Sequence, residues 1–165
     1  MMNQRLAQVA MEEAKKNYHG NTSAAISNLH PLRDLFLQES EVTEELLNAD
    51  WSGSFVYMCT QKAGMEIPLR YPDTRVRHCF AAVSAWEQYA RLPKIHLWHS
   101  AAELPEVGDL AILEHEPGGP GQMGVVLRVE GDVMELAMGN YHNHSAIIEH
   151  PLNEGVRGYV RLIQA

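Results

Sequence analysis

Residues 50–64 of the chain read DWSGSFVYMCTQKAG, and this stretch decides the fold. Asp50 is a residue type that caps helix N-termini, and Gly64 suits the left-handed end of a helix. Between them, apolar residues recur three and four positions apart, which places them on one helical face. These residues are Phe55, Val56, Cys59 and Ala63. The stretch therefore predicts a short buried helix whose first turn holds Ser52.

The first turn of such a helix is an unusual chemical environment. Its unpaired backbone N–H groups and the positive end of the helix dipole favour an anion such as a thiolate or an oxyanion. A cysteine nucleophile is well placed at this position. This chain has Ser52 there instead.

The composition indicates one soluble globular domain spanning residues 1–165. The chain is 45% hydrophobic and 21% charged, and it is long enough to bury a core without disulfides or a metal. The net charge of −8 argues against nucleic acid as a partner, because phosphate binding depends on clustered lysine and arginine. The nine histidines make the charge strongly dependent on pH.

The sequence has no visible targeting or membrane segment. No run approaches the length of a membrane span, and residues 1–13 carry charges where a signal peptide has its apolar stretch. We therefore expect no membrane partner and a cytoplasmic location by default, with export by lysis or by a dedicated secretion system as the alternative. Apolar residues surround Cys59 and Cys79, which predicts two buried free thiols.

The order of patterns along the chain predicts an α+β fold. Helical spacing covers residues 2–16, 24–38, 43–47, 50–64 and 78–92. Strand-like runs cover residues 110–113, 123–129, 133–138, 145–149 and 156–163. We expect N-terminal helices, in residues 1–49, and the central helix to pack on a C-terminal antiparallel sheet of about five strands within residues 105–163.

Four motifs in this order carry a resemblance to a known family: WSGSFV at 51–56, PEVGD at 105–109, GQMGVV at 121–126 and GN at 139–140. They resemble the CHAP branch of the NlpC-type, papain-like amidases and endopeptidases. That family has Trp-Cys-Ala-x-Phe-Val, then Gly-Asp before an aliphatic residue, then Gly-His-x-Gly before two aliphatic residues, and a later strand ending in Gly-Asn. The similarity covers residues 5–163.

The resemblance implies a papain-like domain that hydrolyses peptidoglycan stem peptides with a Cys thiolate, a His base and a polar residue that orients the His. The matching positions here are Ser52, Gln122 and Asn140. The alternative Asp-Cys-Ser-Gly alignment puts Trp51 at the nucleophile position, so neither alignment yields a cysteine. A serine hydroxyl needs an adjacent base, and glutamine cannot act as one. We therefore expect weak or absent hydrolysis.

Three interpretations remain open. The first, which we favour, is a catalytically degenerate homologue that binds a peptidoglycan stem peptide or a protein partner in its cleft. The second is an active amidase or peptidase in which Ser52 is the nucleophile or replaces a catalytic Cys, with His115, His142 or His144 as the base. The third is a structural or interaction domain with a closed cleft. The residues expected to contact a substrate are Trp51, Gly53, His142 and His144.

No other pattern indicates a cofactor or a metal. The histidine pairs at 96 and 99 and at 142 and 144 lack the spacing and the further ligands of a zinc site. The glycine-rich loop at 118–121 lacks the lysine and hydroxyl residues of a phosphate-binding loop. We therefore expect no metal at the histidine pairs and no cofactor at the glycine-rich loop.

Overall fold

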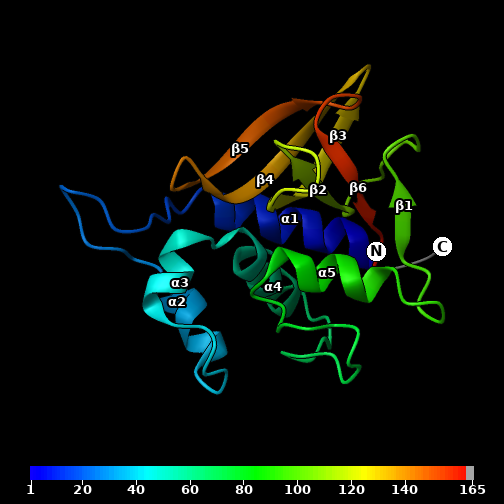
Figure 1. Ribbon diagram of the computed structural model, residues 1–165. Coiled ribbons are helices and arrows are strands. Elements are labelled where there is room, and N and C mark those ends of the chain that lie inside the picture. Colours follow the sequence, from blue (N-terminus) through cyan, green and yellow to red (C-terminus); the bar gives the residue numbers. More distant parts are fainter. Residues whose placement is uncertain (163–165) are drawn as a thin grey trace.

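One antiparallel sheet forms the C-terminal half of the protein. The computed structural model describes residues 1–162 of the chain. Six strands pair in the order β1-β6-β2-β3-β4-β5. Their bounds are β1 (Trp98–Ser100), β2 (Leu110–Glu114), β3 (Gly121–Glu130), β4 (Val133–Tyr141), β5 (His144–Pro151) and β6 (Val156–Val160). Helices lie against one face of this sheet, which confirms the predicted α+β class (Figure 1).

The helices precede the sheet in the chain. They are α1 (Met2–Ala14), α2 (His30–Arg33), the 3₁₀ helix η1 (Asp34–Phe36), α3 (Glu44–Ala49), α4 (Ser52–Lys62) and α5 (Val83–Ala90). The prediction of a helix over residues 24–38 is wrong for its first part. Helix α2 begins only at His30, with Pro31 in its first turn, where a missing N–H costs nothing.

The prediction of a helix over residues 78–92 is also wrong at its start. The Cys79 N–H donates to the Glu41 carboxylate at 2.9 Å, and the Phe80 N–H donates to the Leu69 carbonyl at 2.9 Å. The backbone of Ala82 is extended, with φ −95° and ψ +134°, which interrupts the helical spacing. Helix α5 therefore begins only at Val83.

The expected strand number of about five is wrong by one. Strand β1 is three residues long and pairs with β6, which places it at the edge of the sheet. Three residues are too few to show the alternation by which the other strands are recognised. The predicted end of the last strand, at residue 163, lies outside the described residues.

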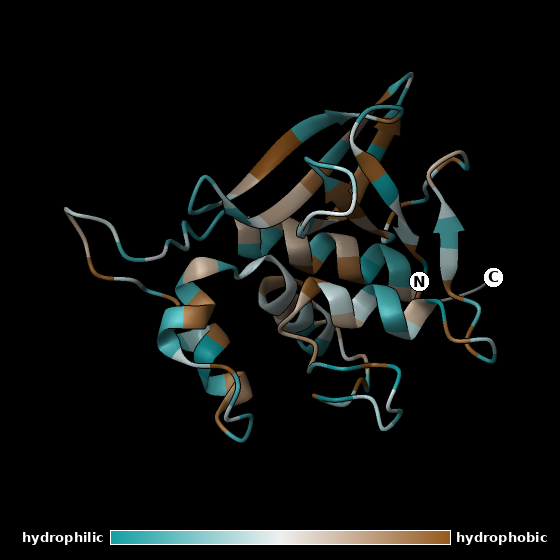
Figure 2. Cartoon of the chain, viewed as in Figure 1, coloured by the Kyte–Doolittle hydropathy of each residue, from teal (hydrophilic) through white to brown (hydrophobic). Residues whose placement is uncertain are grey.

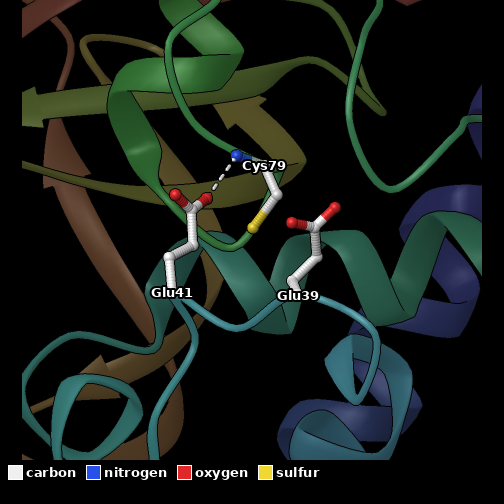
Figure 3. A group of neighbouring side chains, drawn as sticks. All are labelled: Glu39, Glu41 and Cys79. Carbon is white, nitrogen blue, oxygen red and sulfur yellow. Dashed lines mark hydrogen bonds between the residues drawn. The ribbon is translucent and has the colours of Figure 1, made fainter.

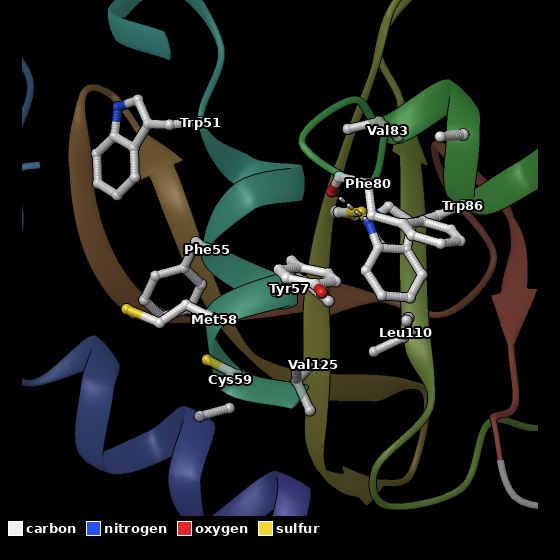
Figure 4. Packing of buried hydrophobic residues seen from close by; sticks show 14 of the residues in the cluster. Trp51, Phe55, Tyr57, Met58, Cys59, Phe80, Val83, Trp86, Leu110 and Val125 are labelled. Carbon is white, nitrogen blue, oxygen red and sulfur yellow. Dashed lines mark hydrogen bonds between the residues drawn. The ribbon is translucent and has the colours of Figure 1, made fainter. Parts of the chain in front are cut away.

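Helix α4 is the centre of the core. Each of its residues from Ser52 to Thr60 is buried, because α4 packs against α1 and α5 and against strands β3 and β4. Its large side chains meet those of the helical layer and the sheet in one cluster (Figure 4). The helix runs to Lys62, and Gly64 follows in the left-handed region with φ +89°, as its position in the sequence predicted.

The other face of the sheet has a core of its own. Side chains from β2, β3, β4 and β6 are fully buried there, and Ile148 of β5 packs against them. Since residues near both edges of the sheet share this cluster, the sheet is curled. Register shifts in the β3–β4 and β2–β6 pairs accompany the curvature. Hydrophobic and hydrophilic residues alternate along several of these strands, as Figure 2 shows.

Both cysteines are free and buried, as predicted. Burial raises the pKa of the Cys59 thiol well above its ordinary range. Among the described residues, no helix combines the length and the hydrophobicity that crossing a membrane requires.

A buried carboxylate ties α1 to α4. Glu13 is only 4% exposed, and its carboxylate accepts hydrogen bonds from Lys16 at 2.8 Å, Lys62 at 2.9 Å and the Tyr18 hydroxyl at 2.7 Å. Burial opposes ionisation of this carboxyl, but the three hydrogen bonds outweigh burial and lower its pKa. The ionised form of Glu13 therefore stabilises the folded protein.

The substitution Glu13→Gln is expected to make the free energy of unfolding less dependent on pH in the acid range. A carboxyl whose pKa is lowered by folding stabilises the protein above its unfolded pKa, and this contribution disappears as the pH falls through the folded value. Urea unfolding between about pH 6 and pH 3 measures the difference. The matched control is Glu12→Gln, an exposed neighbour in α1. Equal pH dependence in the two variants would contradict the expectation.

Candidate functional site

Ser52 begins α4 and lies entirely in the interior, with 0% of its surface exposed. Its hydroxyl donates to Oδ1 of Asp50 at 3.3 Å and accepts a hydrogen bond from the Met123 N–H at 3.3 Å. Both partners belong to the protein framework. In this arrangement the hydroxyl links α4 to β3 and is closed to a ligand.

Gln122 does not face Ser52. The next residue, Met123, is part of the core beneath the helices, and adjacent residues of a strand point to opposite faces. The Gln122 amide donates to the carbonyl of Asn140 at 3.0 Å. Its Oε1 lies 3.2 Å from Nε2 of His115. The side chains that match the family's Cys and His thus diverge.

Asp50 is the group that connects Ser52 with Asn140. Its Oδ1 also accepts the Ser52 N–H at 3.4 Å, but the N-cap residue of α4 is Trp51, so the prediction of Asp50 as the N-cap is wrong by one residue. Burial raises the pKa of the Asp50 carboxyl, while hydrogen bonds from the Ser52 N–H, the Ser52 hydroxyl and the Asn140 side chain oppose the rise. Asn140 therefore interacts with a carboxylate rather than with a histidine.

A polar pocket of about 350 Å³ opens beside Gln122. It is lined by His115, Gln122, Asn140, Tyr141, His142 and Asn143. Two of the proposed bases thus lie together here, but His144 lies outside the lining, and its ring is 6.3 Å from that of His19. Within residues 1–162 no histidine hydrogen-bonds to Ser52.

The hairpin between β4 and β5 has an uncommon backbone. Asn140, His142 and Asn143 have φ values of +58°, +49° and +66°. Residues other than glycine rarely adopt this region, and such strain is found at binding sites. The Asn143 side chain anchors the hairpin by accepting from the Gly20 N–H at 3.1 Å and the Trp51 indole N–H at 3.4 Å.

The two other residues expected to contact a substrate are covered. Trp51 is 0% exposed and Gly53 is buried, so both lie beneath the site as supporting structure. A Cβ at Gly53 would come within 2.6 Å of the Ala81 carbonyl oxygen, so glycine is needed there for close packing.

Two further pockets meet at Asp50. The smaller, of about 210 Å³, is lined by Glu41, Val42, Leu46, Leu47, Asp50, His78, Cys79, Ala81 and Ala82. The larger, of about 500 Å³, is lined by Asp50, Ala82, Val83, Ser84, Glu87, Gln88, Gly118, Gly119, Pro120, Gly121 and Arg157. Because Asp50 and Ala82 line both, the pockets adjoin at the N-terminal end of α4. We call the two together the Asp50 groove.

Arg157 holds the glycine-rich wall of this groove. Its guanidinium donates to Glu114 at 2.6 Å, to Glu87 at 3.1 Å and to the Gly119 carbonyl at 2.6 Å. One side chain thus fixes the loop before β3 to both β2 and α5. Nothing in the sequence around Arg157, which lies in β6, indicated this role.

Glu39, Glu41 and Cys79 are the one group of possible metal ligands within residues 1–162, with ligand atoms within 4.8 Å of one another. Figure 3 shows the Cys79 thiol directed between the two glutamate side chains. Arg70 already binds both carboxylates, at 3.0 Å and 2.8 Å. Burial is the main cause that raises the pKa of Cys79 to about 11. The group is therefore an ion-pair network around a protonated thiol.

The sequence did not reveal which groups these side chains contact. Asp50 was interpreted only as a cap, although it lies at the centre of the groove. The position of Asp50 two residues before Ser52 is the signal that was available, since an Asp side chain commonly accepts the backbone N–H two residues on. Comparisons with known proteins add no relative: no family model, no curated protein and no solved structure matches the chain.

Proposed function

We propose that the protein is a CHAP-like, papain-type domain that binds a peptide, of the kind found in cell-wall stem peptides, in the Asp50 groove without hydrolysing it. One observation carries the proposal. The Ser52 hydroxyl is buried between Asp50 and the Met123 N–H with no imidazole as a partner, while the groove beside it is open.

The chemistry of acyl transfer explains why hydrolysis is not expected. A serine nucleophile requires a base within hydrogen-bond reach and a route for the scissile carbonyl to its oxygen. Ser52 has no imidazole in reach; its one side-chain acceptor, Asp50, also binds the Ser52 N–H and the Asn140 side chain, and the Ser52 oxygen has no exposed surface by which a scissile carbonyl could approach. Gln122 is held by Asn140 and His115 instead.

The groove has the features of a peptide site. Its larger part has polar side chains and a glycine-rich wall, which offers backbone groups to an extended chain, and its smaller part is mainly apolar. Pockets that combine apolar walls with a few polar groups are the usual ligand sites of proteins. The order of the four sequence motifs, which resembles that of the CHAP-type family, also supports the proposal.

A four-form comparison tests the proposal. Purified peptidoglycan digests are incubated with the unchanged chain, Ser52→Ala, Ser52→Cys, and Ser52→Cys with Gln122→His. Mass spectrometry detects released fragments, and co-sedimentation with intact peptidoglycan measures binding. We expect the unchanged chain and Ser52→Ala to release nothing and to bind with affinities within about twofold of each other, since a buried hydroxyl does not contact a ligand.

The two parts of the proposal fail in different ways. Turnover by the unchanged chain that disappears in Ser52→Ala would contradict the absence of catalysis. A lack of binding by all four forms would contradict the peptide site. Fragments released only by the double variant would identify the bond that the groove presents.

A further inference from the structure

The smaller pocket of the Asp50 groove has the size of one side chain. Its volume is about 210 Å³, whereas pockets for whole small ligands ordinarily measure about 300–1,000 Å³. Aliphatic side chains supply most of its wall, together with two carboxylates, the His78 imidazole and the Cys79 thiol. The aliphatic residues are Val42, Leu46, Leu47, Ala81 and Ala82, and the carboxylates are those of Glu41 and Asp50.

The two carboxylates differ in their partners. Glu41 is paired with Arg70 at 2.8 Å and also accepts the Cys79 N–H. Asp50 has only neutral partners, Ser52 and Asn140, and none of the ion pairs formed within residues 1–162 includes it. The arginine that lines the adjoining pocket is bound to two glutamates of its own. Asp50 is thus a half-buried carboxylate without a cation.

The local structure does not require the negative charge of Asp50. Its role at the start of α4 is to accept the Ser52 N–H and hydroxyl, and an asparagine oxygen accepts such hydrogen bonds equally well. Burial makes the ionised form costly, as the raised pKa of this carboxyl indicates. A cation supplied by a ligand would offset this cost.

We propose that the smaller pocket receives a lysine side chain of the bound peptide, with its ammonium group on the Asp50 carboxylate. The inference rests on the peptide-binding function proposed above. Lysine has a long aliphatic stem that fits aliphatic walls and a compact charged head. Ser52 already occupies Oδ1 of Asp50, which leaves this carboxylate poorly suited to the two-oxygen geometry that arginine prefers. The larger pocket, which shares Asp50 and Ala82, then holds the adjoining backbone.

The test uses the full chain and four tripeptides, of which three have a blocked N-terminus and one has a free N-terminus. The first is acetyl-Ala-Lys-Ala-amide, and the second and third replace lysine by norleucine or by Nε-acetyl-lysine. The fourth is the norleucine peptide with a free N-terminus. Binding is measured by NMR from the shifts of the Ala81 and Ala82 amides, in the unchanged chain, in Asp50→Asn, and in the matched control Asp132→Asn, which alters an exposed turn.

We expect the lysine peptide to bind at least about tenfold more tightly than the norleucine and acetyl-lysine peptides, because only lysine offers a charged donor. Asp50→Asn should remove this preference and also raise the melting temperature, whereas Asp132→Asn should change neither. A gain in stability together with a loss of binding distinguishes a ligand-binding charge from a structural one.

Three results would overturn the lysine assignment. They are equal affinity for the lysine and norleucine peptides, an unchanged preference in Asp50→Asn, and no detectable binding of the lysine peptide. Tightest binding of the unblocked norleucine peptide would also overturn it, in favour of an N-terminal ammonium. The co-sedimentation assay on intact peptidoglycan remains independent: if it is positive while the lysine preference is absent, the proposed function stands and only this inference fails.

Discussion

Replacing Asp109 by alanine is expected to lower the free energy of unfolding by about 3–5 kcal/mol, the usual cost of breaking a buried ion pair from one side. Asp109 is 0% exposed and accepts two hydrogen bonds of 2.8 Å from the Arg161 guanidinium. It also accepts the Glu106 N–H at 2.8 Å. The substitution would remove both of these hydrogen bonds from a guanidinium that is only 13% exposed.

Urea unfolding at neutral pH measures this effect. The control is Glu130→Ala, which breaks an exposed pair with Arg128 in which the two side chains are 75% and 57% exposed. Exposed pairs contribute little, so the control should unfold at nearly the same urea concentration as the unchanged chain. A loss below about 1 kcal/mol in Asp109→Ala would mean that this pair is worth no more than a surface pair.

Asp109 also illustrates what the sequence could not reveal. It ends the PEVGD motif, and it directly precedes β2. Its partner Arg161 lies beyond the end of β6, more than fifty positions later, and no local pattern connects the two. The same holds for the segment before α5, where Glu41 and Leu69 take backbone donors from a stretch with helical spacing. Local patterns thus predict many of the elements, but not the contacts that join segments far apart in the sequence.

The candidate site follows the same rule. The order of motifs correctly brought β3, β4 and the start of α4 together, because these elements share the core. Which side chains meet depends on the face of the sheet to which each strand residue points, and a motif does not fix that face. Since Met123 points into the core, Gln122 points away from it, and Ser52 meets the backbone of β3 rather than a side chain. Asp50 consequently became the partner of Ser52.

Replacing Trp51 by alanine is expected to lower the free energy of unfolding by about 3–5 kcal/mol, the range for truncating a buried aromatic side chain. Trp51 has no exposed surface, and it packs where a side chain at residue 139 would otherwise lie: a Cβ built on Gly139 comes within 2.9 Å of its ring. Thermal and urea unfolding measure the loss. The control is Tyr141→Ala, since Tyr141 is 37% exposed and does not belong to the buried core.

A second substitution, Trp51→Phe, tests whether this side chain supports the structure or contacts the ligand. If Trp51 touched a bound peptide, Trp51→Phe would weaken binding while leaving stability nearly unchanged. The buried position predicts the reverse: Trp51→Phe loses the indole hydrogen bond to Asn143, lowers stability by about 1 kcal/mol, and keeps the affinity for peptide. Affinity that falls in Trp51→Phe without any loss of stability would return Trp51 to the binding surface. The expected result instead assigns ligand contact to the walls of the Asp50 groove, whose lining includes neither Trp51 nor Gly53.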